Sequence, residues 1–347
     1  MKKSSQWVMG LLFLVVAFVT TQSAFGDIHG FLWENGTMTD LGTLGSTQVY
    51  AVAINNNGQI VGQSGAYGFI WQNGQMTNFG LLNPYDINDR GQVVGTYTTS
   101  SNITRAFLWQ NGVMTDIGTF GGYSVARAIN DNGQIIGASL DTTGQVHTFL
   151  VNNGTMIDLG TQFGAFSINN SGTIAGYIDV GGTANAALWA NGSITDLGVL
   201  PGCNISVAYS INNAGQVVGK SWSSTNIDSQ FSFIWENGKM TPIGSLGGIY
   251  TEANSINDNG WIVGTSATVS GALHAFLYQG GTMEDLGTLN GIVTDTSQAY
   301  DINNLGQIVG ISDANPFQLP AVPLPPTVLL VGSGLLGLAG WRRIRKS

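Results

Sequence analysis

Five aspartates recur at one phase of a repeating pattern and are the first candidates for chemistry. They are Asp40, Asp116, Asp158, Asp196 and Asp285. Such carboxylates can act as catalytic acids or bases or as metal ligands, but an active site needs a few unlike groups that converge at one place. Because a single residue type returns once per repeat, we expect these aspartates to have a structural role.

Two further acidic segments and three histidines are candidates for metal binding. Asp131-Asn132-Gly133 and Asp258-Asn259-Gly260 resemble fragments of a calcium loop, but they lack the remaining ligands and the distal glutamate. Turn chemistry explains them better. His29, His147 and His274 each stand two residues before the repeated Phe position, which places them in different, non-adjacent units of the fold. We therefore expect no shared metal site.

The remaining candidates are one thiol and one tryptophan. Cys203 is the only cysteine and has no neighbours typical of a nucleophile, so pairing between two chains is its one open alternative. Trp222 lies outside the repeat pattern in the longest connection, Ser221 to Ser232. It is the candidate ligand-binding residue, because an exposed aromatic side chain can stack on a sugar ring, although a packing role is the alternative. The chain lacks the common nucleophile-elbow, zinc-helix and phosphate-loop motifs, so we predict no catalytic residue, metal or cofactor.

The elements that must position these residues repeat seven times. A Phe-Leu-Trp-like triplet returns at intervals of 38 to 46 residues, beginning at Phe31, Phe69, Phe107, Phe149, Ala187, Phe233 and Phe276. A glycine-containing turn, usually Asn-Gly as in Asn35-Gly36, follows each triplet, and a second apolar segment follows the turn. Asn-Gly between alternating apolar runs is the strongest short-range signal for a β-hairpin.

A second hairpin has the same period. Its Ile-Asn pair is followed by a turn and by a strand such as Gln59-Ile60-Val61-Gly62. The closing glycine recurs at Gly62, Gly95, Gly137, Gly176, Gly219, Gly264 and Gly310. Glycine normally weakens a strand, so its return at one phase predicts a crowded position where backbones approach closely, as near a propeller axis.

Two hairpins per repeat predict an all-β fold, a seven-bladed β-propeller of four-stranded antiparallel blades. Six blades are continuous in the chain. The leftover hairpins, Gly30 to Gly42 and Ala299 to Ser312, would complete the seventh blade from both termini and leave no exposed sheet edge. A stacked β-solenoid is the alternative, but it would leave open ends that need caps.

Composition and charge exclude other classes of protein. Glycine accounts for 50 of 347 residues and charged residues for 9%, yet aromatic residues reach 10%, which is too apolar for a disordered linker. All 20 acidic residues but only five of the 11 basic residues lie between Asp27 and Asp313, so this part of the chain has a formal charge of −15. Such a surface repels phosphate backbones, which argues against nucleic-acid binding.

The ends of the chain predict export. Residues 1–26 have a basic start, an apolar run and small residues before a cleavage site between Gly26 and Asp27, as in a signal peptide, with an uncleaved anchor as the alternative. We expect the propeller over residues 27–315, a proline-rich linker and sorting box over 316–326, and an apolar transmembrane helix with a basic tail over 327–347.

The C-terminal segment closely resembles the PEP-CTERM sorting signal of Gram-negative bacteria. The resemblance rests on the Val-Pro-Leu-Pro-Pro-Thr start, the Gly-Ser-Gly-Leu-Leu-Gly-Leu core and the Arg-Arg end of the segment. The matching residues at its two ends are Val322, Pro323, Leu324, Pro325, Pro326, Arg342 and Arg343. It implies transient anchoring in the inner membrane, processing by an exosortase-type transpeptidase, and a location at the cell surface or outside the cell. An ordinary C-terminal membrane anchor is the alternative.

The repeats resemble the HAF-repeat family of bacterial extracellular proteins. The resemblance covers roughly Asp27 to Ser312 and rests on His274-Ala275-Phe276, on Met-Thr-Asp-Leu-Gly-Thr-Leu-Gly and on Ile-Asn-x-x-Gly-Gln-Ile-Val-Gly. It implies a repeat protein of undefined role. We expect a secreted, non-enzymatic protein with a structural, adhesive or polysaccharide-binding role and with an extracellular polysaccharide as a second partner. The alternative is a propeller hydrolase or lyase that acts on such a polysaccharide.

Overall fold

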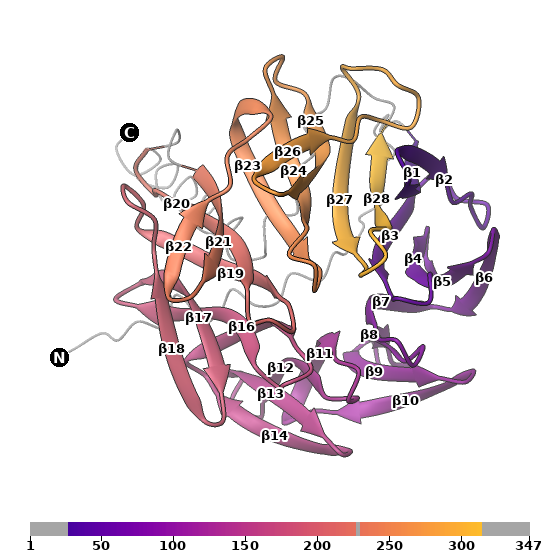
Figure 1. Ribbon diagram of the computed structural model, residues 1–347. Helices are drawn as coiled ribbons and strands as arrows, with labels where there is room; N and C mark the ends of the chain where they lie inside the picture. The colour runs from indigo at the N-terminus through magenta and orange to yellow at the C-terminus, as the bar shows by residue number, and fades with distance from the viewer. Residues whose placement is uncertain (1–26, 227–229, 314–347) are drawn as a thin grey trace, which may run out of the picture.

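The computed structural model describes residues 27–226 and 230–313, which form a ring of seven four-stranded antiparallel sheets (Figure 1). The seven-bladed propeller predicted from the repeats is confirmed, and the solenoid alternative is wrong. The signal peptide, the sorting box and the apolar helix expected over residues 1–26 and 316–347 lie outside the described residues. The described ranges contain strands and no helix, so no helix there could cross a membrane.

Blades are numbered in chain order, and each strand is given from the innermost outward. Blade 1 is β3 (Val49–Ile54), β4 (Ile60–Ser64), β5 (Tyr67–Gln72) and β6 (Gln75–Gly80). Blade 2 is β7 (Leu82–Ile87), β8 (Val93–Thr98), β9 (Thr104–Gln110) and β10 (Val113–Gly118). Blade 3 is β11 (Gly121–Ile129), β12 (Ile135–Asp141), β13 (Val146–Asn152) and β14 (Thr155–Gly160). Blade 4 is β15 (Phe163–Ile168), β16 (Ile174–Val180), β17 (Thr183–Ala190) and β18 (Ser193–Gly198).

The remaining three blades follow the same order. Blade 5 is β19 (Ile205–Ile211), β20 (Val217–Trp222), β21 (Gln230–Glu236) and β22 (Lys239–Pro242). Blade 6 is β23 (Gly247–Ile256), β24 (Ile262–Thr268), β25 (Leu273–Gln279) and β26 (Thr282–Asp285). Blade 7 is β27 (Thr296–Ile302), β28 (Ile308–Asp313), β1 (Ile28–Glu34) and β2 (Thr37–Asp40).

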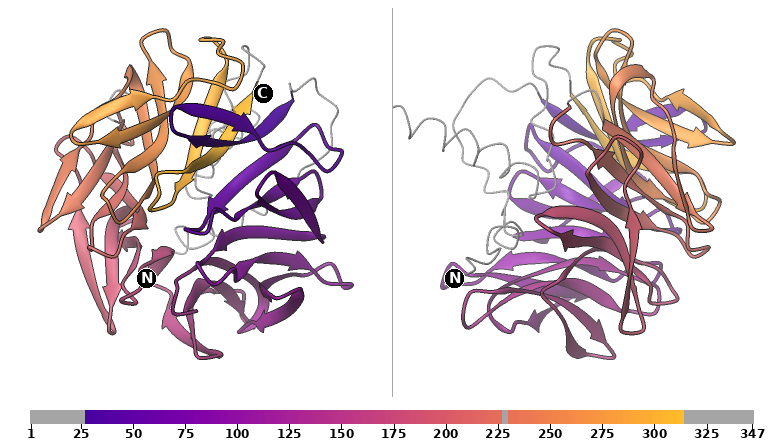
Figure 2. Two further views of the ribbon diagram at one scale, coloured as in Figure 1. Left: turned by 45° about the vertical axis from the view of Figure 1, so that its right-hand side comes forward. Right: turned by 90° about the vertical axis from the view of Figure 1, so that its left-hand side faces the viewer.

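Blade 7 closes the ring from both ends of the described chain, as the leftover hairpins predicted. Strand β1 pairs with β28, with Ile28 opposite Asp313 and Phe31 opposite Gly310. Figure 2 shows this blade as the place where the indigo and yellow strands lie together. Because Ile28 and Asp313 are paired neighbours, the chain enters and leaves the propeller at the same end of the ring.

The antiparallel order gives the ring two unlike faces. The turns between first and second strands and between third and fourth strands lie at one end, which we call the turn face. The connections between second and third strands, and those from one blade to the next, lie at the opposite end, which we call the connection face. Ile28, Asp313 and Trp222 are all at the connection face.

The Asn-Gly turns have the backbone conformation that the sequence predicted. Six asparagines at the first turn position have φ values of 50 to 52°, and the glycines that follow them have φ values of 76 to 82°. Both central residues of a type I′ turn need positive φ, which asparagine and glycine tolerate. These turns set the register in which the Phe-Leu-Trp strand pairs with the outermost strand.

Seven apolar clusters fill the spaces between neighbouring blades. Each draws on two sheets; one joins Val94 and Ala106 of blade 2 to Ile129 and Phe149 of blade 3. The repeated Phe is fully buried in the six blades that have it. Burial of such a side chain stabilises the fold by about 1.5–3 kcal/mol, so blade-to-blade packing stabilises the ring in place of disulfides.

The repeated second-strand glycine is crowded, but for a reason other than closeness to the axis. In every blade the innermost strand has a β-bulge just before its Ile-Asn pair, opposite this glycine. A Cβ on Gly137 would lie 2.0 Å from the carbonyl oxygen of Val125 and 2.5 Å from the Phe149 ring. The glycine therefore accommodates the bulge from the second strand, one strand removed from the axis.

We expect Gly137→Ala to destabilise the protein by about 2–3 kcal/mol, because backbone atoms on one side and a buried ring on the other leave no room for a methyl group. Urea unfolding of the intact chain measures the change. Thr155→Ala, an exposed position on the outermost strand of the same blade, is the control and should change stability by less than about 0.5 kcal/mol. Equal stabilities of the two variants would refute the assignment of crowding to the bulge.

Candidate functional site

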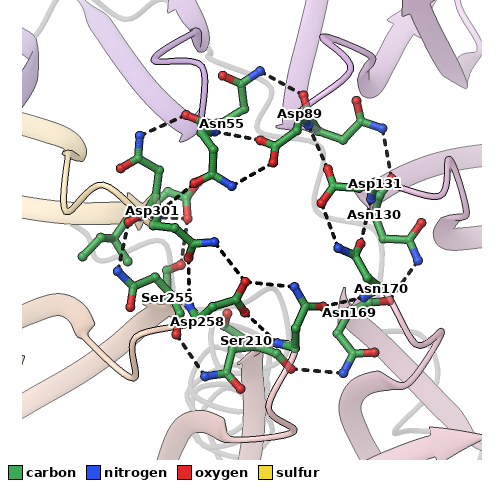
Figure 3. A pocket seen from close by; sticks show the side chains of 18 of the residues that line it. Asn55, Asp89, Asn130, Asp131, Asn169, Asn170, Ser210, Ser255, Asp258 and Asp301 are labelled. Carbon is green, nitrogen blue, oxygen red and sulfur yellow. Dashed lines mark hydrogen bonds between the residues drawn. The ribbon is translucent and has the colours of Figure 1, made fainter.

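The innermost strands of the seven blades surround a central channel, and the Ile-Asn pairs lie at its mouth on the turn face (Figure 3). The asparagine of each pair is 3–6% exposed. Its Oδ1 accepts the N–H of the residue four positions later and so fixes the turn of its own blade. In five blades the amide nitrogen also donates to the Oε1 of the glutamine at that position, and its second N–H remains to bond outside the turn.

That nitrogen joins each blade to the next. Nδ2 of each asparagine donates to the backbone carbonyl of the equivalent asparagine in the following blade, over 2.9–3.1 Å. The seventh bond, from Asn303 to Asn55, closes the circle. We call these residues the asparagine ring: Asn55, Asn88, Asn130, Asn169, Asn212, Asn257 and Asn303.

A second circle of hydrogen bonds lies directly beside the first. The residue after each ring asparagine donates its backbone N–H to the Oδ1 of its counterpart in the next blade, over 2.7–2.9 Å. We call this set the Asx ring: Asn56, Asp89, Asp131, Asn170, Asn213, Asp258 and Asn304. Asp131 and Asp258, which the sequence assigned to turns, thus also bond between blades.

The three carboxylates of the Asx ring are held by neighbouring amides. Asp258 accepts the side chains of Asn213 and Asn304 at 3.0 and 2.9 Å. Burial acts to raise its pKa, but these bonds and the Asn213 backbone N–H hold the pKa below its usual value. The described residues contain no group of three His, Cys, Asp or Glu side chains that could hold a metal ion.

Two further carboxyl groups lie on the innermost strands just below the rings. Asp86 accepts the backbone N–H of Ile129 in the next blade at 2.8 Å and that of Ile87 at 2.8 Å. Burial raises its pKa to about 8, and the charge of Asp301 adds to this effect. The corresponding residue in the neighbouring blades is alanine, Ala53 or Ala128.

Asp301 bonds in the same way. Its carboxyl oxygens accept the N–H of Ile54 in the next blade at 2.9 Å, the N–H of Ile302 at 2.9 Å and the hydroxyl of Ser255 at 2.7 Å. Burial raises its pKa to about 6, although these bonds oppose the shift. Because the oxygens of Asp86 and Asp301 are bonded to backbone donors, both act as links between blades.

Farther into the channel the blades stop resembling one another. The extra residue of each bulge is half-exposed on its innermost strand, and we call this set the bulge belt: Val52, Tyr85, Arg127, Phe166, Tyr209, Asn254 and Tyr300. The guanidinium of Arg127 lies 5.2 Å from the centre of the Phe166 ring, and Phe166 meets Tyr209 edge to face. β-Bulges re-aim side chains and are frequent next to functional sites.

The channel wall is most unusual in blades 5 to 7, where unlike charged and polar groups converge. Nζ of Lys220 lies 3.9 Å from Glu252 and 4.2 Å from the centre of the Tyr250 ring, and the Tyr250 hydroxyl donates to Glu252. Burial lowers the pKa of Lys220, with Glu252 opposing the shift. This part of the wall therefore departs from the repeat.

A cavity of about 180 Å³ adjoins this cluster between the innermost strands of blades 6 and 7. Its lining comes from the bulge belt, from the cluster and from the strands behind them: Tyr250, Glu252, Asn254, Thr265, Leu273, Gln298 and Tyr300. The lining thus combines two aromatic rings, a carboxylate, two amides, three hydroxyl groups and one leucine side chain. Such groups can bind a small polar ligand by hydrogen bonds and ring contacts.

The repeated aspartates lie away from the channel, near the outer strands. In each, Oδ1 accepts the backbone N–H of the glycine two residues later. Three of them also meet a histidine Nδ1 of the same blade at 2.8–2.9 Å, in the pairs His29 with Asp40, His147 with Asp158 and His274 with Asp285. These contacts join the third strand to the end of the fourth strand, and the bond from the glycine fixes the turn of the chain that follows, so the role is structural.

One expectation about the histidines is wrong. His274 lies on β25 of blade 6 and His29 on β1 of blade 7, and these blades are neighbours, because blade 7 is assembled from both ends of the chain. Each histidine nevertheless bonds to the aspartate of its own blade. The hydrogen bond with Asp285 raises the pKa of His274, against the effect of burial.

Trp222 and Cys203 occupy ordinary positions at the connection face. Trp222 is the half-buried last residue of β20, and its carbonyl accepts the N–H of Asn204. It lies two residues after Lys220, so the two side chains share a side of the sheet. Cys203 is a free thiol, partly buried against the apolar cluster between blades 4 and 5.

No family model and no curated protein matches the chain. Among solved structures it is similar to the β-propeller domain of the Trilobed protease from Pyrococcus furiosus, with 11% identity and a TM-score of 0.51 over 73% of this chain and 83% of that one. The shared property is the fold. The Pyrococcus domain is described as having an open velcro topology, whereas the pairing of β1 with β28 closes the ring here.

Two other solved structures extend the likeness without adding an activity. A puromycin-hydrolyzing peptidase of Mycobacterium tuberculosis has 9% identity and a TM-score of 0.53 over 74% of this chain and 48% of that one, so the chain spans about half of its length. TolB from Acinetobacter baumannii has 10% identity and a TM-score of 0.46 over 77% and 79%. At identities this low, the likeness to the Pyrococcus domain and to the Mycobacterium peptidase shows a shared propeller fold and nothing more. The function must be argued from the site.

We expect Asn130→Asp to cost about 3 kcal/mol of stability. The change keeps the shape and the acceptors of the side chain but removes the donors to Asn169 and Gln134, and it places a carboxylate against their oxygens. Asn132→Ala is the control, since the exposed Asn132 donates one bond to Asn170 and blade 5 has alanine, Ala214, at this position. Its cost should stay below about 1 kcal/mol. Thermal and urea unfolding measure both changes, and a fully stable Asn130→Asp protein would contradict the role of the ring.

The raised pKa of Asp86 predicts a loss of stability with rising pH. The folded chain holds this proton up to about pH 8, whereas the unfolded chain releases it near the usual value of 3.8, so stability falls as the pH rises between these values. We expect the wild type to lose on the order of 2 kcal/mol more than Asp86→Ala between pH 4 and 8, which is less than the full shift would give because Asp86 is partly exposed. Urea unfolding at several pH values checks this, with Asp158→Ala as a control; parallel pH profiles of Asp86→Ala and the wild type would exclude it.

Proposed function

We propose that this protein is an exported, non-enzymatic propeller of the bacterial cell surface or extracellular matrix that binds polysaccharide. The observation that carries the proposal is the half-exposed bulge belt, which is rich in aromatic, amide and cationic groups at a repeat phase where no two neighbouring blades agree. Positions that repeat in every blade hold the ring together. A position that varies while it lines the channel is free to recognise a ligand.

The chemistry of the belt favours a sugar polymer over other partners. Tyrosine and phenylalanine rings stack on the C–H faces of sugars, and amides and hydroxyls bond to sugar hydroxyl groups. The negative charge of the propeller disfavours binding of a nucleic acid, because residues 27–313 contain 20 acidic residues and only five basic ones. Trp222, at the connection face on the strand of Lys220, is a second candidate for stacking.

The proposal includes export and sorting because residues 1–26 resemble a signal peptide and the C-terminal segment resembles a sorting signal. The PEP-CTERM-like residues Val322 to Pro326 would be processed by an exosortase-type transpeptidase of the inner membrane. The geometry of the body adds one consequence: since Ile28 and Asp313 are paired at the connection face, the turn face is the one opposite the exit of the chain. The HAF-like repeats fit an extracellular setting.

The rival function, a polysaccharide hydrolase or lyase, has one observation in its favour. Lys220, Glu252 and Tyr250 form a cluster of unlike ionisable groups beside a cavity, as active sites often do. Against it, the other channel carboxyls, Asp86 and Asp301, are bonded to backbone donors. We therefore assign the cluster to binding.

The intact chain should be retained on insoluble polysaccharide and should release no new reducing ends or unsaturated sugars from it. Pull-down with matrix polysaccharide of a Gram-negative bacterium, followed by reducing-end and ultraviolet assays, measures both. A single-stranded DNA resin serves as the control and should retain no protein. Turnover of the polysaccharide would show that the protein is an enzyme, as the rival function states. Failure to bind any polysaccharide would refute the proposed function.

Trp222→Ala tests whether the connection face takes part. We expect binding to weaken about fivefold if the indole stacks on a sugar, since one such contact is worth roughly 1 kcal/mol. Tyr67→Ala, an exposed aromatic residue at the connection face of blade 1, is the matched control and should bind like the wild type. Unchanged binding by Trp222→Ala would confine the site to the channel.

A further inference from the structure

We infer that the cavity between blades 6 and 7 is a subsite for one neutral sugar residue, taken from the end of a polysaccharide chain. This rests on the proposed polysaccharide-binding function and assigns its place and its specificity. The cavity lies between β23 and β27, the innermost strands of the two blades. Four observations carry the assignment.

The first is that the lining departs from the repeat. Glu252 and Gln298 occupy one repeat position, and Asn254 and Tyr300 occupy the bulge position. In blades 3 to 5 the residues equivalent to Glu252 are Val125, Gly164 and Val207. Blades 1 and 2 have Tyr50 and Asn83 at this position, but blade 1 has Val52 at its bulge, so blades 6 and 7 are the two adjacent blades that carry polar groups at both positions.

The second is that the lining matches a pyranose ring. A sugar ring presents hydroxyl groups at its edge, which both donate and accept, and C–H groups on its faces. Asn254 and Gln298 carry both donors and acceptors, and Thr265 and Tyr300 carry hydroxyl groups. The Tyr250 and Tyr300 rings supply apolar surface.

The third is the charge at the cavity. Glu252 borders it and is only 7% exposed, whereas the balancing Lys220, 4% exposed, is not part of the lining. The ligand therefore meets a carboxylate fixed by Tyr250 and Lys220 and not the ammonium group. A carboxylate accepts sugar hydroxyl groups well but repels uronic acids and sulfated sugars, so the site selects a neutral sugar.

The fourth is size and place. A volume of about 180 Å³ admits one sugar ring but not a row of them, and the cavity is set in the wall between two innermost strands. An internal residue of a polymer would need room for the chain on both sides of its ring. A terminal residue needs only one exit, so the site recognises chain ends.

Filling the cavity tests the inference with little risk to the fold. Thr265→Leu places extra carbon atoms in the cavity, since Thr265 lies opposite Glu252 on β24 and lines the cavity. Thr96→Leu is the matched control, because Thr96 lies opposite Asn83 at the same position of blade 2 and is equally buried. We expect Thr265→Leu to weaken binding more than tenfold and Thr96→Leu to leave it unchanged, with similar melting temperatures.

A second pair of variants removes one hydroxyl each. Tyr300→Phe keeps the ring but loses the hydroxyl at the cavity, and we expect binding about fivefold weaker. Tyr67→Phe makes the same change at the exposed tyrosine on the connection face of blade 1, outside the bulge belt and the cavity, and should bind like the wild type. This pair keeps the test decisive should Thr265→Leu fail to fold.

Calorimetry of the intact chain with cellohexaose, maltohexaose and mannohexaose, and with oligogalacturonate of the same length, provides the measurement. At least one neutral hexamer should bind at least tenfold more tightly than oligogalacturonate, and a hexamer oxidised at its ends should lose affinity. If Thr265→Leu and Tyr300→Phe both bind the neutral hexamer as tightly as the wild type does, the cavity is not a sugar subsite, while the proposed function stands. Absence of binding to every polysaccharide would overturn both.

Discussion

The hydrogen bond from each ring asparagine to the next blade is the contact on which the rest of the structure depends. A propeller blade packs its broad faces against its neighbours through apolar side chains, and this packing is non-directional. The amide bond supplies direction, since it joins a side chain pinned by its own turn to the carbonyl of the equivalent turn. Seven such bonds fix the angle between blades, and the circle closes only when all seven are made.

This arrangement separates the parts of each blade that must be alike from the parts that are free to differ. The Ile-Asn turn, the second-strand glycine and the buried Phe serve the ring and recur almost without change. The bulge inserts one extra residue two positions before the isoleucine of the turn, and this residue is not a member of the asparagine ring. Tyr85 and Arg127 can therefore occupy equivalent positions without breaking that ring, and Asn254 there adds a bond to the next blade, from its Nδ2 to the carbonyl oxygen of Ala299.

Much of the fold could be predicted from the sequence because its signals are local. Asn35-Gly36 specifies a hairpin by the φ values that its two residues tolerate, and the offset between the two hairpins at the chain ends predicts the closing blade. The crowding at Gly137 was also predictable, but its cause was not, because a bulge leaves no distinctive residue type. The adjacency of His274 and His29 was missed because the closing blade makes distant parts of the sequence neighbours.

The site was harder to predict than the fold. Asparagine in a turn is explained by local turn chemistry alone, so Asn130 gave no reason to expect a bond to another blade; only its return in all seven repeats beside a second Asx residue was a usable signal. Glu252 and Gln298 each occur once, on different blades. Nothing in the sequence shows that they face one cavity, because that depends on the curvature of the ring.

The pairing of β28 on both sides has a mechanical consequence. This strand lies between β27 and β1, so a force applied to the chain beyond Asp313 acts on two hydrogen-bonded ladders at once. Had β28 been an outermost strand, as β2 is, a single ladder would resist the pull and could open one bond at a time. The order of strands in the closing blade thus gives the end of the propeller at Asp313 more resistance to tension than an outermost strand would have.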